Sequence, residues 1–273
     1  AGLEAACTAA EVGCNTFLLE EKETLGGLAA EISKIPAKKR LADFPHYLEH
    51  RAAGLDNLYI FTGTQATPDN IRKFHPNLIV NATGSGPLLP PIKGLMDNID
   101  KEGGNVYSIL GMIHHINDFP QDLEGKKVAV IGGGAVGLDV VEFFAARKAD
   151  ISIVEMMDQI GRDLDPVTKN DMKCQMKAHG VHQLTKTALL EVKEHSFLVK
   201  GSEGEYELPF DYGFVCLGMR AKGQLYPQLL EAFADDDVEI INIGDSQRAR
   251  RIIDGTMEGR NILYHLTQRG YLD

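Results

Sequence analysis

The chain has 273 residues, of which 44% are hydrophobic and 25% charged, so we expect a globular, soluble protein with one large or two modest domains. The formal net charge of −11 argues against a nucleic-acid partner, and the sequence has no apolar run of about 18 residues that would predict a membrane span. The four cysteines form no C-x-x-C pair, which favours reduced thiols in a cytoplasmic protein.

The chain opens on a segment rich in small residues, which predicts a helix from Gly2. A short apolar strand at 15–19 follows and ends at Glu20. Glycine, helix, apolar strand and acid recur between Gly137 and Glu155 with the same spacing of 18 residues, so both segments read as dinucleotide-binding units. Because the strand and glycines that should precede the first segment are absent, we expect a fragment. An ordinary alanine-rich helix at the start of a complete protein is the alternative.

The next hundred residues predict alternating helices and strands. Apolar runs and breakers place helices at 38–53 and 106–118, strands at 58–61 and 78–83, and a crossover rich in Pro and Gly at 85–91.

The centre of the chain carries its strongest motif. A strand at 128–131 runs into a glycine turn and then a helix over 138–147. A second strand at 151–154 ends at Glu155, where a carboxylate would accept hydrogen bonds from an adenosine ribose. The turn itself has the G-x-G-x-x-G spacing and reads Gly132-Gly133-Gly134-Ala135-Val136-Gly137.

Each glycine of this spacing has a separate task in dinucleotide binding. Gly132 permits the tight turn, Gly134 lets the backbone approach a pyrophosphate, and Gly137 lets the helix pack closely on the strand. The N-terminus of the helix then faces the phosphates with free N–H groups and a positive dipole end. A glycine-rich turn in some other α/β unit is the weaker alternative.

The rest of the chain completes two units. A helix is expected at 166–179, strands at 188–192, 196–200, 205–209, 212–218 and 239–245, and a long helix at 248–268. The first unit is therefore split around an inserted second one. We expect an FAD-binding domain at 1–95, an NAD-binding domain at 96–222 and the closing part of the FAD-binding domain at 223–273.

Several reactive side chains have structural explanations that we favour. His114 and His115 are adjacent on a predicted helix and point apart, which favours surface or packing roles over catalysis. Arg220 follows the strand at 212–218, and a surface salt bridge is more plausible there than closure of the site. Cys7 and Cys14 share a face of the predicted first helix, and we interpret them as packing residues.

The two nested units and several short segments of the chain resemble the two-nucleotide flavoprotein reductases. Glu20, Lys22 and the Leu-Gly-Gly at 25–27 resemble the segment that follows the second strand in that group. Two further segments resemble flavin-site motifs, namely Ala82-Thr83-Gly84 and Gly244-Asp245, the latter holding the ribityl chain of the flavin in that group. A redox-active cysteine pair, which disulfide reductases place soon after the Leu-Gly-Gly, is absent here.

The tail at 251–259 resembles one branch of this group. That branch is the C-terminal, FAD- and NAD(P)-binding half of 2-enoate reductase, 2,4-dienoyl-CoA reductase and trimethylamine dehydrogenase. The resemblance implies an α/β fold with two Rossmann-like domains, one inserted in the other, and with the first strand of the FAD domain missing. It also implies an upstream barrel that carries FMN and a 4Fe-4S cluster. We expect no metal site and no catalytic residue in the present chain. The expected cofactor-binding residues are Gly2, Glu20, Lys22, Gly26, Gly27, Ala82, Thr83, Gly84, Gly132, Gly133, Gly134, Ala135, Val136, Gly137, Glu155, Gly218, Gly244 and Asp245.

The activity implied by the resemblance is a relay of electrons. NADH would give a hydride to FAD, and electrons would pass through the 4Fe-4S cluster to FMN, where an enoate- or enoyl-type C=C bond is reduced. Glu155 predicts NADH rather than NADPH, because a carboxylate repels a 2′-phosphate. The alternatives are a nucleotide-binding module without turnover and a stand-alone NADH:acceptor flavoprotein.

The missing first strand has consequences of its own. Its loss would leave unpaired backbone groups on two neighbouring strands and remove the turn that approaches the FAD pyrophosphate. We therefore expect weak or absent FAD binding by this chain alone, retained NADH affinity, and self-association through the open slot.

Overall fold

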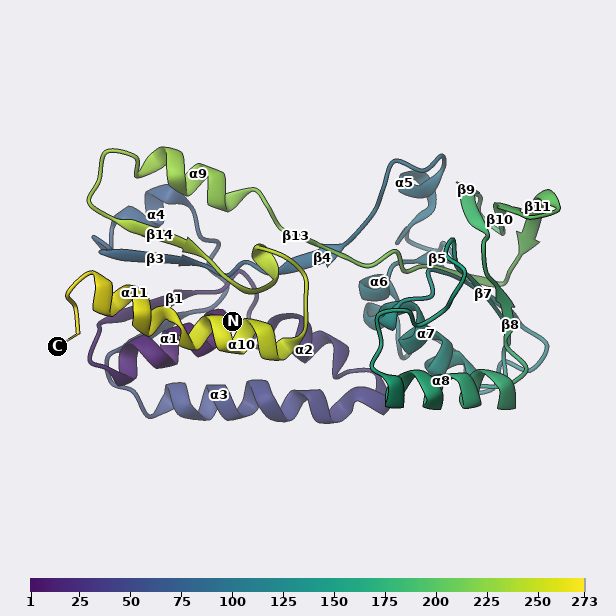
Figure 1. Ribbon diagram of the computed structural model, residues 1–273, viewed down its shortest axis with the longest axis horizontal. Coiled ribbons are helices and arrows are strands. Elements are labelled where there is room, and N and C mark those ends of the chain that lie inside the picture. Colours follow the sequence, from purple (N-terminus) through teal and green to yellow (C-terminus); the bar gives the residue numbers. More distant parts are fainter. Residues whose placement is uncertain (273) are drawn as a thin grey trace. The chain divides into compact units, whose positions relative to one another are not determined.

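The computed structural model describes residues 1–272 and divides the chain into two compact units (Figure 1). Unit 1 comprises residues 1–34, 38–86 and the chain from Met219 onward. Unit 2 comprises residues 35–37 and 87–218. The mixed α/β class with parallel strands is confirmed, and a segment of the chain is nested inside another, as the sequence predicts.

Unit 2 is built on a five-stranded sheet with the order β5-β12-β6-β7-β8, in which all neighbours are parallel. Parallel order requires crossovers, and α7 and α8 supply two of them. The strands are β5 (Val106–Tyr107), β6 (Lys127–Ile131), β7 (Asp150–Val154), β8 (His182–Leu184) and β12 (Tyr212–Val215). The helices are α5 (Leu95–Asn98), α6 (Ile109–His114), α7 (Ala135–Ala145) and α8 (Pro166–Ala178).

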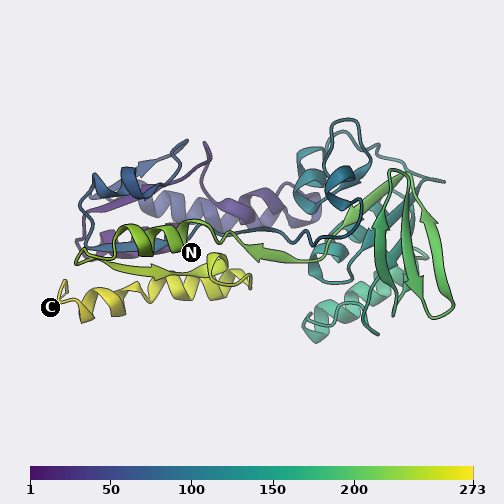
Figure 2. The same ribbon diagram turned by 90° about the horizontal axis from the view of Figure 1, so that it is seen from above.

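The two faces of this sheet have different covers. A small antiparallel sheet of β9 (Ala188–Val192), β10 (Ser196–Gly201) and β11 (Gly204–Pro209) packs on one face, and its strands lie side by side in Figures 1 and 2. The layer between the two sheets is apolar and includes Ile131, Val154 and Phe197. On the helical face, the aromatic rings of Phe119, Phe144 and Phe214 pack against one another.

In unit 1 the strands form separate pairs. The parallel pairs are β1 (Thr16–Leu19) with β2 (Leu58–Phe61) and β3 (Leu78–Asn81) with β14 (Glu239–Asn242). Within residues 1–272 no strand joins β1 to β3. A third pair, β4 (Ser85–Pro87) with β13 (Met219–Ala221), lies where the chain passes between the units.

Helix α1 (Gly2–Glu11) packs on both the β1–β2 pair and the β3–β14 pair. Ala5 and Ala9 belong to the core above β3 and β14, whereas Ala6, Cys7 and Ala10 belong to the core above β1 and β2. Small residues on two faces of one helix therefore allow close contact with both pairs. The remaining helices of the unit are α2 (Gly27–Ile32), α3 (Asp43–Ala53), α4 (Pro68–Arg72), α9 (Leu225–Ala232), α10 (Ile252–Arg260) and α11 (Ile262–Gln268), with 3₁₀ turns η1 (Pro36–Ala42), shared with unit 2, and η2 (Gly244–Ser246).

Three predicted helices are wrong in their extent. The helix expected at 106–118 is strand β5 followed by α6, because the Ser108 side chain accepts a hydrogen bond from the N–H of Gly111 and caps a new helix there. The helix expected at 38–53 begins only at Asp43, after the 3₁₀ turn η1. The long terminal helix begins at Ile252 and is divided at Asn261, and the residues before it form a turn around Asp245.

Candidate dinucleotide sites

The glycine turn after β6 brings backbone into contact with backbone. Gly132 has φ +105°, and a Cβ added there would lie 2.2 Å from the carbonyl oxygen of Cys216 on the neighbouring chain segment. A Cβ on Gly137 would lie 1.9 Å from the carbonyl oxygen of Gly132. Any side chain at either position would therefore force the strand, turn and helix apart.

Gly134 differs from these two glycines because its surroundings are open. It is the N-cap residue of α7, no side chain caps the helix, and a Cβ added there would meet nothing within 4 Å. The first helical residues, Ala135 and Val136, carry N–H groups that helix geometry leaves without an intrahelical acceptor. A pyrophosphate needs close backbone approach, free N–H groups and a positive dipole end, and this turn fits all three needs.

Glu155 follows β7 and already holds two backbone donors. Its Oε2 accepts the N–H of Gly133 at 2.7 Å, and its Oε1 accepts the N–H of Met157 at 2.8 Å. These bonds fix the carboxylate beside the glycine turn before any ligand arrives. A carboxylate has about four acceptor positions, so two remain for ribose hydroxyls.

The segment after Glu155 is tied to the same turn. The N–H of Gly161 donates to the carbonyl oxygen of Gly133 at 2.7 Å, and Ile160 is buried against it. A Cβ on Gly133 would lie 3.0 Å from the Ile160 side chain and 3.1 Å from Oε2 of Glu155. The absence of a side chain at Gly133 is therefore what lets this segment lie on the turn.

Glu20 in unit 1 repeats this arrangement. The N–H of Lys22 donates to Oε1 of Glu20 at 3.0 Å, as the N–H of Met157 does to Glu155. Glu20 also donates its N–H to the carbonyl of Phe61 and accepts the N–H of Thr64, at 2.9 and 2.8 Å.

Equivalent backbone hydrogen bonds form in unit 2, where Glu155 follows β7 and Thr187 follows β8. The N–H of Glu155 donates to the carbonyl of Leu184, and the N–H of Thr187 donates to the carbonyl of Glu155, at 2.9 and 3.0 Å. The residues before the two threonines, Gly63 and Lys186, have positive φ values of 60° and 52°. The similarity of the two segments therefore extends beyond their spacing to individual backbone hydrogen bonds.

The Gly26-Gly27 segment begins helix α2 through positive φ angles of 99° and 55°. Near the end of this helix, Glu31 is buried and pairs with Lys22 at 2.8 Å and Lys34 at 2.6 Å. Hydrogen bonds from Lys22 and then Lys34 lower the pKa of Glu31 to about 2. Glu31 thus holds the Lys22 side chain two residues after Glu20.

The second cluster in unit 1 contains Asp245 and the segment after β3. Oδ2 of Asp245 accepts a hydrogen bond from the hydroxyl of Ser85 at 3.0 Å, and Oδ1 of Asp245 accepts one from the backbone N–H of Arg250 at 3.0 Å. Gly84 has φ +77°, and its carbonyl accepts the N–H of Lys222 at 2.9 Å. These bonds place the segment Ala82-Thr83-Gly84 beside the Gly244-Asp245 turn.

Gly2 packs helix α1 on this cluster, since a Cβ there would lie 3.1 Å from Cβ of Ala82. Gly244 has φ +66°, and its N–H donates to Glu258. Gly218 belongs to unit 2, where its carbonyl accepts the N–H of Leu88. The predicted site residues thus gather in two places in unit 1 and one in unit 2, and the carbonyl of Gly218 bonds to Leu88 rather than to any of them.

Sequence reasoning missed Ser85, Glu258 and Thr187. The hydroxyl of Ser85 and the carboxylate of Glu258 contact the Gly-Asp turn through bonds between residues far apart in the chain, which no spacing rule could reveal. Thr187 lies 32 residues after Glu155 whereas Thr64 lies 44 residues after Glu20, so spacing from the acid did not reveal their common role.

The other candidates remain outside these clusters. Arg220 is exposed, and no ion pair to it exists among residues 1–272. His114 is exposed, and His115 pairs with Asp118 at 2.9 Å. Cys14 lies beyond the end of α1, so the expected shared helical face with Cys7 is wrong.

All four cysteines are free thiols. Burial raises the pKa values of Cys7, Cys14 and Cys216, and the Cys7 thiol donates to the carbonyl of Leu48.

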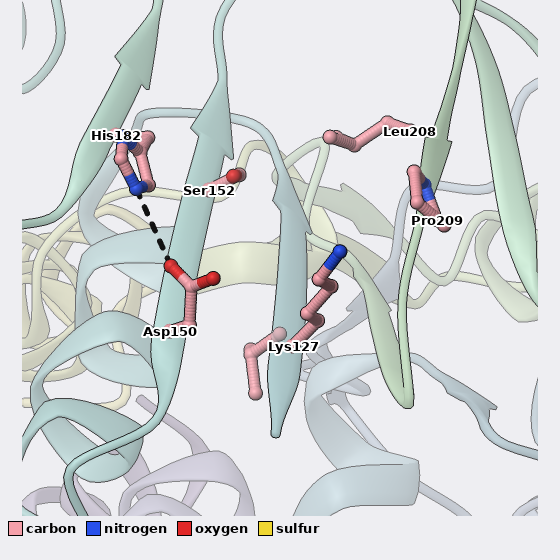
Figure 3. A pocket seen from close by; sticks show the side chains of 7 residues that line it. Lys127, Asp150, Ser152, His182, Leu208 and Pro209 are labelled. Carbon is pink, nitrogen blue, oxygen red and sulfur yellow. Dashed lines mark ion pairs between the residues drawn. The ribbon is translucent and has the colours of Figure 1, made fainter. Parts of the chain in front are cut away.

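A cavity of about 210 Å³ lies at the opposite edge of the unit 2 sheet (Figure 3). Lys127, Asp150 and His182 begin three neighbouring strands there, and His182 pairs with Asp150 at 3.3 Å. Ligands of parallel sheets bind at the carboxyl ends of the strands, where the glycine turn lies. This cavity at the amino ends is therefore not part of the dinucleotide site.

Neither a metal-binding cluster nor a membrane-spanning helix is found among the described residues. Within residues 1–272, no cluster of three or more His, Cys, Asp or Glu side chains could hold a metal ion. No helix in the same range has the length and apolar character needed to cross a membrane.

Curated relatives match almost the whole chain. An NADH oxidase of Thermoanaerobacter brockii is 30% identical over 97% of this chain and 39% of its own length. A bilirubin reductase of Mediterraneibacter gnavus is 28% identical over 95% of this chain and 38% of its own. A metal reductase of Desulforamulus reducens is 28% identical over 96% of this chain and 42% of its own length. The chain thus spans about 40% of the length of these relatives.

Solved structures share the fold. A 2-naphthoyl-CoA reductase matches 95% of this chain and 37% of its own with a TM-score of 0.81 and 21% identity. A histamine dehydrogenase from Rhizobium sp. 4-9 matches 97% of this chain and 42% of its own, with a TM-score of 0.81 and 18% identity.

The family model for pyridine nucleotide-disulphide oxidoreductases matches residues 1–244. This match confirms the resemblance to the FAD- and NAD(P)-binding part of flavoprotein reductases, although the present chain has no adjacent cysteine pair to act as a dithiol relay. With two acidic turns of the same pattern, one in each unit, the chain belongs to the pyridine nucleotide-disulphide oxidoreductase family of flavin-dependent NAD(P)H oxidoreductases.

Proposed function

We propose that the protein binds NADH in unit 2 and FAD in unit 1 and passes a hydride from the first to the second. The observation that carries the proposal is the repeated acidic turn, in which Glu20 and Glu155 accept the N–H group two residues on. When bound, the nicotinamide supplies the hydride and the flavin accepts it. The protein groups bind and orient both cofactors.

The residues of unit 2 have defined tasks in this proposal. Gly134, Ala135 and Val136 present backbone N–H groups to the pyrophosphate, and Glu155 accepts the ribose hydroxyls. Because Glu155 would repel a 2′-phosphate, the proposal includes a preference for NADH over NADPH. No arginine or lysine follows Glu155 before Arg162, so the segment directly after this acid supplies no cation to offset that repulsion.

The residues of unit 1 have the corresponding tasks for FAD. Glu20 accepts from the adenosine ribose, and Asp245 accepts from the ribityl chain. Both carboxylates have acceptor positions left after their internal hydrogen bonds, which supports this assignment.

We further propose that the natural protein is longer and carries an upstream barrel with FMN and a 4Fe-4S cluster, through which an enoate- or enoyl-type C=C bond is reduced. The length of the relatives and the name of the 2-naphthoyl-CoA reductase support this proposal. A second candidate is an NADH:acceptor flavoprotein without C=C reduction, which the name of the NADH oxidase relative favours.

Anaerobic assays of the natural full-length protein separate these candidates. Oxidation of NADH that depends on a conjugated enoate or enoyl thioester, with metal analysis that finds iron and sulfide, is the expected result. Oxidation of NADH only by an added dye, or only after oxygen is admitted, would favour the second candidate. Failure to bind either nucleotide would contradict both.

A further inference from the structure

The Gly244-Asp245 turn is held by a side chain from the following helix. Oε2 of Glu258, on α10, accepts the N–H of Gly244 at 2.6 Å. Gly244 has a left-handed φ of +66°, so the chain leaves the direction of β14 at this residue. Glu258 therefore supplies the acceptor for an N–H that lies beyond the last residue of β14.

The other oxygen of Glu258 binds Arg250. The guanidinium of Arg250 donates to Oε1 of Glu258, and this hydrogen bond raises the pKa of Arg250. The backbone N–H of the same arginine donates to Oδ1 of Asp245 at 3.0 Å. Arg250 therefore contacts Glu258 with its side chain and Asp245 with its backbone.

These contacts close a loop of bonds around Asp245. Glu258 fixes Gly244, which precedes Asp245, and it also fixes Arg250, whose N–H holds one oxygen of Asp245. Ser85 holds the other oxygen. The direction of the Asp245 carboxylate is thus set by Glu258 through two separate connections, neither of which is a direct contact between the two acids.

We propose that Glu258 and Arg250 are positioning residues for Asp245, and that they set the affinity of unit 1 for the ribityl hydroxyls of a flavin. This proposal rests on the proposed function, because it takes FAD as the ligand of unit 1. Neither side chain needs to touch the flavin. Loss of Glu258 would let Asp245 rotate or shift, because the charge-assisted hydrogen bonds to Gly244 and Arg250 would be lost with it.

The test is a double-mutant cycle on the natural full-length protein, with the dissociation constant of FAD measured by titrating the flavin-free protein. Glu258→Ala should raise that constant about tenfold. Glu258→Gln should raise it less, because its amide oxygen can still accept the N–H of Gly244. In the Asp245→Ala background, Glu258→Ala should cause no further loss, because Glu258 acts through Asp245.

Controls separate positioning from a general loss of stability. Glu231→Gln removes an exposed carboxylate from α9 and should change neither FAD affinity nor the unfolding midpoint. NADH affinity in unit 2 should be unchanged in every variant. An effect of Glu258→Ala that is the same with and without Asp245 would overturn the proposal and indicate a structural role only.

FAD binding by the unaltered protein distinguishes failure of the positioning proposal from failure of the proposed function. If it binds FAD but Glu258→Ala binds FAD equally well, the positioning proposal fails and the proposed function stands. If the unaltered protein binds no FAD, both fail, because unit 1 then has no flavin for Asp245 to hold.

Discussion

The glycine turn of unit 2 and the Gly-Asp turn of unit 1 each donate a backbone N–H to a glutamate, Glu155 or Glu258, but backbone packs more closely on the first turn. In unit 2, Gly132 and Gly137 allow contacts that any Cβ would prevent. In unit 1, Ser85 and Glu258 add side-chain hydrogen bonds to the turn at Gly244 and Asp245. The first turn should therefore be especially sensitive to added backbone-facing atoms, and the second to loss of the Ser85 or Glu258 side chain.

The largest effect should come from Gly132→Ala. The new Cβ would lie 2.2 Å from a backbone oxygen, at a φ of +105° that alanine rarely adopts. We expect the free energy of unfolding to fall by about 3 kcal/mol, measured by urea denaturation. Gly223→Ala, where a Cβ meets nothing within 4 Å, is the matched control and should be neutral. Equal midpoints for the two variants would show that the turn can relax.

Gly134→Ala should separate binding from stability within the same turn. Its Cβ meets no protein atom, so the unfolding free energy should stay within about 0.5 kcal/mol of the original. The same Cβ would occupy the space where a pyrophosphate approaches α7. We expect NADH affinity, followed by fluorescence titration, to fall about thirtyfold, or ~2 kcal/mol. Unchanged affinity would place the phosphates elsewhere.

Glu155→Ala should alter the choice between nucleotides. The carboxylate would accept a free 2′-hydroxyl and repel a 2′-phosphate, so its loss should weaken NADH binding and spare NADPH. The ratio of the two dissociation constants should narrow about tenfold, or ~1.4 kcal/mol. A preference for NADPH in the unaltered protein would remove the basis of this prediction.

The smallest effect concerns Glu31 and depends on pH. Lys22 and Lys34 lower its pKa from 4.5 to about 2, so its contribution to stability is present above about pH 4.5 and is lost as the pH falls toward 2. Glu31→Gln should cost about 1 kcal/mol at pH 6 and almost nothing at pH 2. Urea denaturation at both pH values measures this difference. A cost that does not change with pH would mean that packing, not charge, is lost.

The regular parts of the fold followed from the sequence because they depend on local patterns. Strands β2 and β9 occupy the predicted residues, since their apolar runs have clear turn signals on both sides. The strand and glycine turn at 127–137 were predicted for the same reason. Strand β8 was missed because its sequence, His-Gln-Leu, lacks an apolar run and its pairing with β7 is what orders it.

The site was predictable where it depends on backbone and spacing. The equivalence of Glu20 and Glu155 was visible in the spacing of 18 residues from a glycine, and the structure adds their matching hydrogen bonds. The roles of Ser85 and Glu258 were not predictable, because their contacts join residues 160 and 14 positions apart through the folded core. Side-chain contacts of this kind exist only once the chain has folded.

The central claim is that one chain binds NADH and FAD and passes a hydride between them. The most direct test is an anaerobic titration of the FAD-containing natural protein with NADH, followed at the visible absorption maximum of the flavin. The account predicts that the flavin absorbance bleaches with one equivalent of NADH per FAD, and that Gly134→Ala requires far more NADH. A flavin that stays oxidised while NADH is bound would contradict the account.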